Sequence, residues 1–256
     1  VELLSAPPEH ENNTIPSVHR IWHSESAVSA SYYDDFPRSG GDYWWRVRAV
    51  DEAGNTIGVY SDSQKMTVAA PDQPLLAASF GDSITHGGGA LSYSPADPEY
   101  SYESYLDFES PNLGRSGDTA RMSAERFEQD VLPYHPANLL ILCGSNDLRD
   151  PGISAEDTIA ELEKIRLACE HNNIRPIFLT LMPINPENIY RAFQTETDEN
   201  WHEKMDTINA FIREQPYYID LEPYFYNRSG QLARKYATDG LHGDILMSHL
   251  LDRYTV

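Results

Sequence analysis

The sequence predicts an α/β domain with a mostly parallel sheet, preceded by a small all-β module. Residues 1–70 are rich in aromatic, serine and turn residues and show no helical period. From Leu75 onward, short apolar runs alternate with helical segments, which is the pattern of successive βαβ units. A chain of 256 residues has room for one domain of ordinary size and a smaller one. We therefore expect a module over 1–70, a linker over 71–74 and a second domain over 75–256.

The clearest strand of the first module is predicted over residues 42–50 (DYWWRVRAV), where side chains alternate with a period of two residues. Turn residues follow at 51–55 (DEAGN), and residues 64–68 (QKMTV) predict a further strand. This succession resembles the late strands of a fibronectin type III domain. Because sandwich domains of the related immunoglobulin class have about 100 residues, we expect the early strands to be missing or degenerate.

The second domain begins with an apolar run and ends with a helical segment. Its strands are predicted over 75–80, 138–143, 176–182 and 217–221, with a short strand just before Asn112. Helices are predicted over 118–132, 154–172, 198–214 and 244–254. Ser154 precedes Asp157 at the spacing of a capping box, which marks the start of the second of these helices.

The charge balance restricts the partners of the chain. With 40 acidic and 19 basic residues the formal net charge is −21, so nucleic acid and anionic membranes are poor candidates and neutral substrates fit best. A basic residue near the site could still attract an anionic group despite this net charge. Two cysteines, Cys143 and Cys169, are too few for a disulfide framework, and their spacing does not indicate zinc. No apolar stretch of about 18 residues predicts a membrane span.

A serine occupies the position where an open α/β sheet places its ligands. Ser83 follows the first strand of the second domain, in the stretch GDSIT. A serine hydroxyl is a weak nucleophile until a base removes its proton, and that base needs a third group to hold it. Asp239 and His242 (DGLH) can supply both, because a separation of three residues on a turn lets the carboxylate accept the imidazole N–H. The alternative roles are a helix N-cap for Ser83 and a turn residue for Asp239.

Two further polar segments follow apolar runs at the same predicted edge of the sheet. They are NLGRSG, which contains Gly114, and GSND, which contains Asn146. Ester hydrolysis builds negative charge on the carbonyl oxygen, and fixed N–H donors stabilise that charge. Gly114 could bring its backbone N–H close because it lacks a Cβ atom, and Asn146 could offer a side-chain amide.

The four segments GDSIT, NLGRSG, GSND and DGLH, in this order, resemble the sequence blocks of the SGNH hydrolases, also called GDSL lipases or esterases. The resemblance spans residues 75–256 and implies a flavodoxin-like, three-layer α/β fold without a cofactor or metal. It implies a triad of Ser83, Asp239 and His242, and an oxyanion hole of Ser83, Gly114 and Asn146. The first block has isoleucine where many members have leucine, which is a conservative change.

The substrate expected from these features is a short-chain ester, an O-acetyl group on a carbohydrate, either a small molecule or a polysaccharide. The stretches after the first block and after residue 182 carry aromatic residues that could line a cleft, and His86, Tyr100, Tyr190 and Trp201 are the candidate contacts. The appended β module is typical of secreted bacterial polysaccharide-degrading enzymes, so a secreted or cell-envelope location is expected. The sequence predicts no oligomeric state.

Several alternatives remain open at this level. Thioesterase and lysophospholipase activities occur in the same family, and the fold does not choose between them. A metallophosphoesterase would need several His and Asp ligands around two metals, whereas the segments here carry Ser83 and Ser145 where histidines would be expected. A non-catalytic scaffold of two modules is the remaining alternative.

Overall fold

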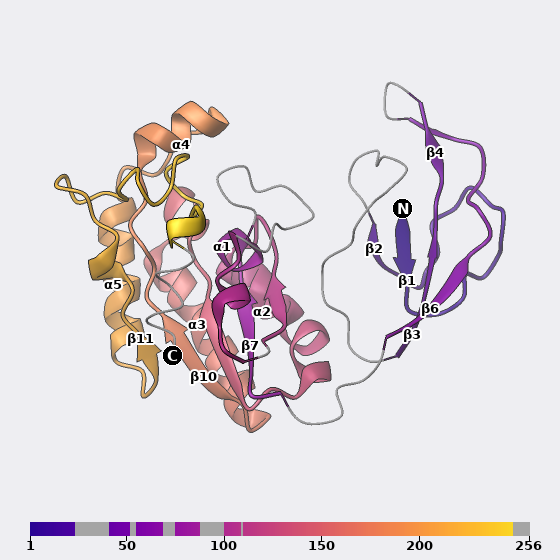
Figure 1. Ribbon diagram of the computed structural model, residues 1–256, viewed down its shortest axis with the longest axis horizontal. Coiled ribbons are helices and arrows are strands. Elements are labelled where there is room, and N and C mark those ends of the chain that lie inside the picture. The colour runs from indigo at the N-terminus through magenta and orange to yellow at the C-terminus, as the bar shows by residue number, and fades with distance from the viewer. Residues whose placement is uncertain (24–40, 52–54, 69–74, 88–99, 109, 248–256) are drawn as a thin grey trace. The chain divides into compact units, whose positions relative to one another are not determined.

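The computed structural model describes residues 1–23, 41–51, 55–68, 75–87, 100–108 and 110–247 (Figure 1). The contacts divide the chain into two units, with the main division between residues 72 and 73. The predicted linker, 71–74, lies outside the described residues. We describe each unit by itself. In the part of the chain that the structure describes, no helix is both long enough and apolar enough to cross a membrane.

The first unit contains an antiparallel sheet in the order β2-β1-β3-β6. Its strands are β1 (Glu2–Leu4), β2 (Arg20–His23), β3 (Gly41–Arg46) and β6 (Gln64–Val68), and a separate pair is formed by β4 (Ala49–Val50) and β5 (Thr56–Ile57). The single strand predicted over 42–50 is therefore two strands. β3 ends at Arg46, and at the next residue the Val47 carbonyl accepts a hydrogen bond from the Ser61 N–H while the Val47 N–H donates to the Ser61 hydroxyl. The likeness to a fibronectin type III domain stays a prediction.

A buried ion pair lies inside this small unit. The Nε of Arg46 donates to Oε1 of Glu2 at 2.6 Å, and both side chains are almost fully buried. The guanidinium also lies 4.1 Å from the centroid of the Tyr60 ring. Neighbouring Trp45 is 38% exposed, so the strand turns its charged residue inward and an aromatic residue outward. A buried charge of this kind is tolerated because it is paired and hydrogen-bonded.

The second unit is built on a five-stranded parallel sheet in the order β11-β10-β9-β7-β8, which confirms the predicted flavodoxin-like α/β fold. The strands are β7 (Ala77–Gly81), β8 (Asn112–Gly114), β9 (Asn138–Leu142), β10 (Arg175–Leu179) and β11 (Tyr218–Ile219). After β8 the chain crosses to the other side of β7 and continues outward through β9. Ligands of doubly wound sheets bind at this reversal, outside the carboxyl ends of the strands.

Three long helices form a continuous row in contact with one another (Figure 1): α2 (Ala120–Asp130), α3 (Ala155–His171) and α5 (Trp201–Arg213). Their starts and ends lie within three residues of the predicted ones. Ser154 and Asp157 form the expected capping box at the start of α3. The last predicted helix is described only up to residue 247, and the rest of it lies outside the described residues.

One helix was not predicted. The stretch from residue 185 contains α4 (Pro186–Phe193), which begins with Asn185 as N-cap and proline in its first turn. The side-chain oxygen of Asn185 accepts a hydrogen bond from the Asn188 N–H at 3.1 Å. Asparagine followed by proline is a start signal for a helix, so the sequence did contain the indication.

Candidate active site

Ser83 lies at the start of a short helix, α1 (Ser83–His86), directly after β7. Asp82 caps this helix, and its Oδ1 accepts a hydrogen bond from the Ile84 N–H at 2.9 Å. As the first helical residue, Ser83 has a backbone N–H without an intrahelical acceptor. The hydroxyl and the N–H of the same residue are therefore both presented at the carboxyl end of the sheet.

Two glycines let backbone segments around α1 lie close together. A Cβ atom on Gly81 would lie 2.3 Å from the carbonyl oxygen of Leu142, and one on Gly114 would lie 2.2 Å from the backbone nitrogen of His86. Both distances are far below a van der Waals contact. Glycine is therefore required at position 81 for the close approach of β7 to β9, and at position 114 for the close approach of β8 to α1.

His242 and Asp239 complete a hydrogen-bonded chain with Ser83. The His242 Nε2 lies 2.7 Å from the Ser83 Oγ, and the His242 Nδ1 lies 2.8 Å from Oδ2 of Asp239. All three side chains are buried. Two backbone N–H groups, of Leu241 and His242, donate to the other oxygen of Asp239 at 2.8 Å each. The carboxylate is thus fixed, and it in turn orients the imidazole.

The loop that carries the histidine is attached to the segment before α4. Gly240 adopts a φ of 87°, and its carbonyl oxygen accepts a hydrogen bond from the Asn185 N–H at 2.8 Å. On the other side of the imidazole, the Phe193 ring of α4 meets His242 edge to face, with centroids 5.8 Å apart. Asp239 and Phe193 therefore hold the His242 ring from two sides.

Asn146, the predicted side-chain donor, lies after the strand next to β7. That strand is β9, and Asn146 caps the 3-10 turn η5 (Asp147–Arg149). Its Nδ2 donates to the backbone carbonyl of Asp118 at 2.9 Å. An amide nitrogen carries two hydrogens, so this bond fixes the side chain and leaves one N–H for another acceptor.

The structure corrects the prediction for Gly114. Its N–H already donates to the side-chain oxygen of Asn112 at 2.9 Å, and its α-carbon faces the backbone of His86. Gly117, three residues on, has a φ of 86° and open space around the position of a Cβ atom. Its N–H donates to no acceptor among the described residues. Of the two glycines of NLGRSG, Gly117 is therefore the one whose N–H remains available, whereas the N–H of Gly114 is occupied.

A buried arginine connects the loops around the site, and sequence reasoning missed it. Arg126 of α2 donates to the carbonyl oxygens of Gly81 and Leu113 at 2.9 Å each, which are the ends of β7 and β8. It also donates to carboxylate oxygens of Asp118 at 2.5 Å and of Asp130 at 3.0 Å. One side chain thus fixes both strand ends and the loop whose carbonyl orients Asn146.

Three carboxyl groups near the site have raised pKa values. Burial raises the pKa of Asp82 to about 6, against the effect of its hydrogen bond from Ile84. Burial also raises the pKa of Asp118 and Asp147, opposed for Asp118 by the Arg126 guanidinium and for Asp147 by the Ala120 N–H. The residues after β7, β8 and β9 therefore lie in a water-poor environment, where fixed donors act strongly on developing charge.

The model of the GDSL-like lipase/acylhydrolase family matches residues 79–244, which is more than half of the chain. The chain belongs to this family. The match includes all the residues of the Ser83, Gly117, Asn146 and His242 segments. No curated protein matches the chain.

Solved structures of other GDSL-type proteins share this fold. A GDSL-like lipase from Bacteroides thetaiotaomicron has 20% identity and a TM-score of 0.56, over 73% of this chain and 90% of its own. The lipase/acylhydrolase from Enterococcus faecalis has 21% identity and a TM-score of 0.55, over 70% and 92%. A catalytic mutant of an acetylxylan esterase from Geobacillus stearothermophilus has 19% identity and a TM-score of 0.54, over 70% and 91%. At these identities the likeness concerns the fold alone.

The predicted substrate contacts of this GDSL-family chain lie in different environments. Trp201 is 7% exposed and packs in the hydrophobic core at the start of α5, and its contact with substrate stays a prediction. Its ring packs against His202 at 5.0 Å. Tyr190 is exposed on α4, whereas Tyr100 and His86 are half-buried. For these three residues, contact with substrate stays a prediction.

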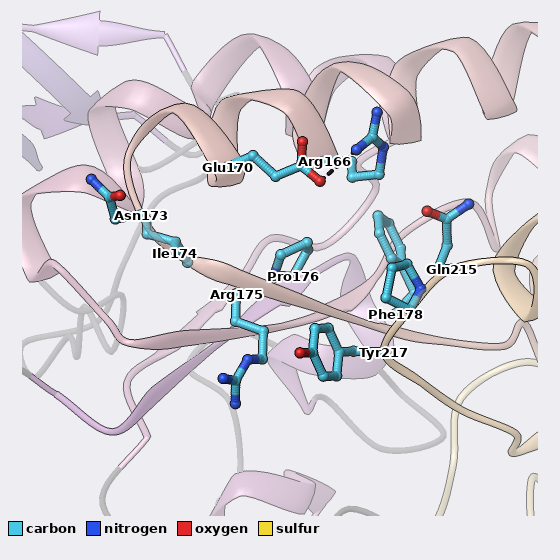
Figure 2. A pocket seen from close by; sticks show the side chains of 10 residues that line it. Arg166, Glu170, Asn173, Ile174, Arg175, Pro176, Phe178, Gln215 and Tyr217 are labelled. Carbon is cyan, nitrogen blue, oxygen red and sulfur yellow. Dashed lines mark hydrogen bonds and ion pairs between the residues drawn. The ribbon is translucent and has the colours of Figure 1, made fainter.

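Figure 2 shows a groove that is separate from the triad residues. It is lined by the end of α3, the start of β10 and the segment after α5. Arg166 and Glu170 form an ion pair at 2.5 Å, and the guanidinium of Arg175 lies 4.8 Å from the centroid of the Tyr217 ring. Because Arg175 begins β10, the groove is at the amino ends of the strands and no triad residue lines it.

Proposed function

We propose that this GDSL-family acylhydrolase is a serine ester hydrolase that removes acetyl groups from carbohydrate hydroxyls. Its family supports a carboxylic ester hydrolase, and the acetyl and carbohydrate specificity is our proposal. The observation that carries the serine hydrolase function is the chain of short hydrogen bonds from Ser83 through His242 to Asp239. We assign to Ser83 the role of nucleophile, to His242 that of general base and to Asp239 that of orienting acid.

In the first half of the reaction, the Ser83 Oγ attacks the ester carbonyl carbon while its proton passes to the His242 Nε2. The carbonyl oxygen becomes negatively charged and receives hydrogen bonds from the Ser83 N–H and the Asn146 amide. Gly117 takes the place of Gly114 as the third donor. The carbon–oxygen bond to the alcohol then breaks, and the imidazolium returns its proton to the leaving alcohol.

In the second half, a water molecule attacks the acyl-serine and gives its proton to the same Nε2 of His242. The bond between the carbonyl carbon and the Ser83 oxygen breaks, the proton returns to Ser83, and the carboxylic acid leaves. The Asp239 carboxylate stabilises the imidazolium formed in each half. Two backbone N–H groups and the imidazole donate hydrogen bonds to this carboxylate, so it stays a hydrogen-bond acceptor throughout.

Three features support a carbohydrate ester. Tyr190 presents an exposed aromatic ring on α4, close in sequence to Phe193, which touches His242. One structural relative is described as an acetylxylan esterase. A β module precedes the hydrolase domain, as in many secreted enzymes that degrade polysaccharides, and we include an extracytoplasmic location in the proposal. Thioesterase and lysophospholipase activities are the alternatives within the family.

The metallophosphoesterase alternative gains no support from the side chains of the site. Across residues that the structure describes, no three His, Cys, Asp or Glu side chains gather as metal ligands. The groups around Ser83 are instead an imidazole, a carboxylate and amide donors, which suit acyl transfer.

The test compares hydrolysis of p-nitrophenyl esters from acetyl to decanoyl, followed by acetylated xylan and simple acetylated sugars. We expect kcat/KM to be highest for acetyl and to vanish in Ser83→Ala. A preference for chains of eight or more carbons would contradict the acetyl proposal and favour a lysophospholipase. An organophosphonate probe should label the wild type and not Ser83→Ala, and no labelling of either would favour the scaffold alternative.

A further inference from the structure

A second arginine lies close to the catalytic groups and has no role in the steps above. Arg149 ends the 3-10 turn η5, and its N–H donates to the carbonyl of Asn146 at 3.1 Å. In a 3-10 turn, side chains three residues apart project from the same face. Arg149 therefore projects from the same side of the turn as the Asn146 amide, which we assign to the oxyanion hole.

The charge of Arg149 is not neutralised within the described part of the chain, where no carboxylate lies within ion-pair distance of it. Asp198, whose N–H donates to the Arg149 carbonyl, has its carboxylate paired with Lys204 at 2.5 Å. The carboxylate of Asp239 interacts with Arg149 at longer range, but its oxygens are bound to His242 and two backbone N–H groups. Arg149 is half-buried, and a partly desolvated charge gains from a counter-ion, which no carboxylate among the described residues supplies at close range.

The hydrogen bonding of the guanidinium is also incomplete. One terminal nitrogen donates to the Thr195 hydroxyl at 3.1 Å, while the Nε is buried and has no acceptor among the residues described. Burial lowers the pKa of Arg149, but an arginine keeps its charge at neutral pH. A desolvated N–H without an acceptor is costly, and such groups are found where a ligand supplies the missing partner.

An aromatic ring links this cation to the triad. The guanidinium carbon lies 5.9 Å from the centroid of Phe193, and the same ring meets His242 edge to face at 5.8 Å. Phe193 is therefore a neighbour of both the cation and the imidazole, which places Arg149 near the triad. A substrate group that extends past the reacting carbonyl by the width of one ring would come within reach of Arg149.

We propose that Arg149 binds a carboxylate on the alcohol portion of the substrate, so that acetyl esters of acidic sugars, such as uronic acids, are the preferred class. This inference rests on the proposed acetylesterase function. An acetyl group is too small to carry a second polar group, so the anion must belong to the sugar. Arginine is the side chain best suited to a carboxylate because its planar fork donates two parallel hydrogen bonds. The net charge of −21 repels anions in general, and a dedicated cation beside the triad overcomes this locally.

The test compares O-acetylated galacturonic acid with its methyl ester, in which the same sugar has lost its negative charge. For the wild type at neutral pH, we expect kcat/KM to be about 10- to 100-fold higher for the acid, mainly through KM. Arg149→Gln should reduce the ratio of the two values to near one, and Arg149→Lys should keep a smaller preference. Arg191→Gln is the matched control: it removes the same charge from α4, where Arg191 is exposed and paired with Glu187, and should leave the ratio unchanged.

The outcomes separate this inference from the proposed function. Ser83-dependent hydrolysis of both sugars without preference for the acid would overturn the role of Arg149 and leave the esterase intact. A preference that persists in Arg149→Gln would overturn it as well. Absence of Ser83-dependent hydrolysis of any acetyl ester would overturn the proposed function and this inference together. Binding of galacturonate to Ser83→Ala, measured by calorimetry and lost in Ser83→Ala/Arg149→Gln, would support the site without requiring turnover.

Discussion

Replacement of Arg126 by methionine is the perturbation that best tests how the site is held. Arg126 is 7% exposed, and its guanidinium donates to two strand-end carbonyls and to the carboxylates of Asp118 and Asp130. It also lies 4.3 Å from the centroid of the Phe80 ring. Methionine fills much of the same space but donates no hydrogen bond, so the change removes the charge and leaves most of the volume.

The size of the stability loss depends on which carboxylates lose their ion-pair partner. Asp130 keeps an ion pair with Arg115 at 3.2 Å, whereas Asp118 loses its only close ion-pair partner among the described residues. Breaking a buried pair from one side costs about 3–5 kcal/mol. We expect the free energy of unfolding at pH 7 to fall by about that amount. Because the Asp118 carbonyl orients Asn146, kcat should also fall by about 10-fold or more.

The sign of the pH dependence follows from the pKa of Asp118. Burial already raises this pKa in the wild type and Arg126 opposes the rise, so its loss raises the pKa further. When the folded pKa lies above the unfolded value, the carboxylate destabilises the fold at neutral pH, and this penalty disappears as the pH falls below the unfolded pKa. The variant should therefore approach wild-type stability near pH 4.

The assay is urea unfolding of four proteins at pH 7 and near pH 4: wild type, Arg126→Met, Asp118→Asn and the double variant. The double variant should be more stable at pH 7 than Arg126→Met alone, because the unpaired charge is gone. Arg121→Met on the exposed face of the same helix is the control and should change stability by less than about 0.5 kcal/mol. An equal loss at both pH values, or no recovery in the double variant, would refute the reasoning.

Three other predictions concern the loops around Ser83. Asp82→Asn keeps the oxygen that caps α1 and removes a carboxyl group whose pKa is raised to about 6. Thermal melts should therefore show a free energy of unfolding about 1–3 kcal/mol above that of the wild type at pH 8, and this difference should disappear as the pH falls to 4. Gly114→Ala should lower the urea midpoint by an amount equivalent to about 2 kcal/mol or more, because the new Cβ would overlap the His86 backbone. Gly117→Ala should cost only about 1 kcal/mol of backbone strain. Equal losses would contradict the different roles of the two glycines. Asn146→Ala should lower kcat for p-nitrophenyl acetate by about 10²–10³ with less change in KM, and an unchanged kcat would remove Asn146 from the oxyanion hole.

The sheet and the triad segments could be predicted because their signals are local. Apolar runs of four to six residues mark strands, and each triad segment follows or precedes a recognisable element. Ser83 and His242 are 159 residues apart, yet the strand-end rule and the family resemblance were enough to bring them together. The structure then places their side chains within hydrogen-bond distance.

The sequence is insufficient where a contact between distant segments decides the role of a residue. Gly114 and Gly117 are indistinguishable as glycines, and only the Asn112 side chain and the His86 backbone show which N–H is occupied. Trp201 begins an amphipathic helix, and its burial depends on packing that its own segment does not reveal. Arg149 follows the Asn146 segment directly, but only the structure shows that no carboxylate among the described residues lies within ion-pair distance of it and that Asp198 is paired with Lys204.

The groups assigned to catalysis are supported by two different kinds of structure. The Ser83, Gly117 and Asn146 segments follow β7, β8 and β9, which are hydrogen-bonded neighbours in one sheet, so the oxyanion donors share one frame that Arg126 further ties together. The histidine instead arrives on a loop after the sheet has ended, and the bond from Asn185 to Gly240 fixes that loop. Since hydrogen bonds within a sheet are cooperative and the separate contacts of a loop are not, a disturbance of α4 should displace the base before it displaces the donors. The segment that carries Phe193 and lies beside Arg149 is thus also the one that sets the position of His242, which couples substrate contact on that side to proton transfer.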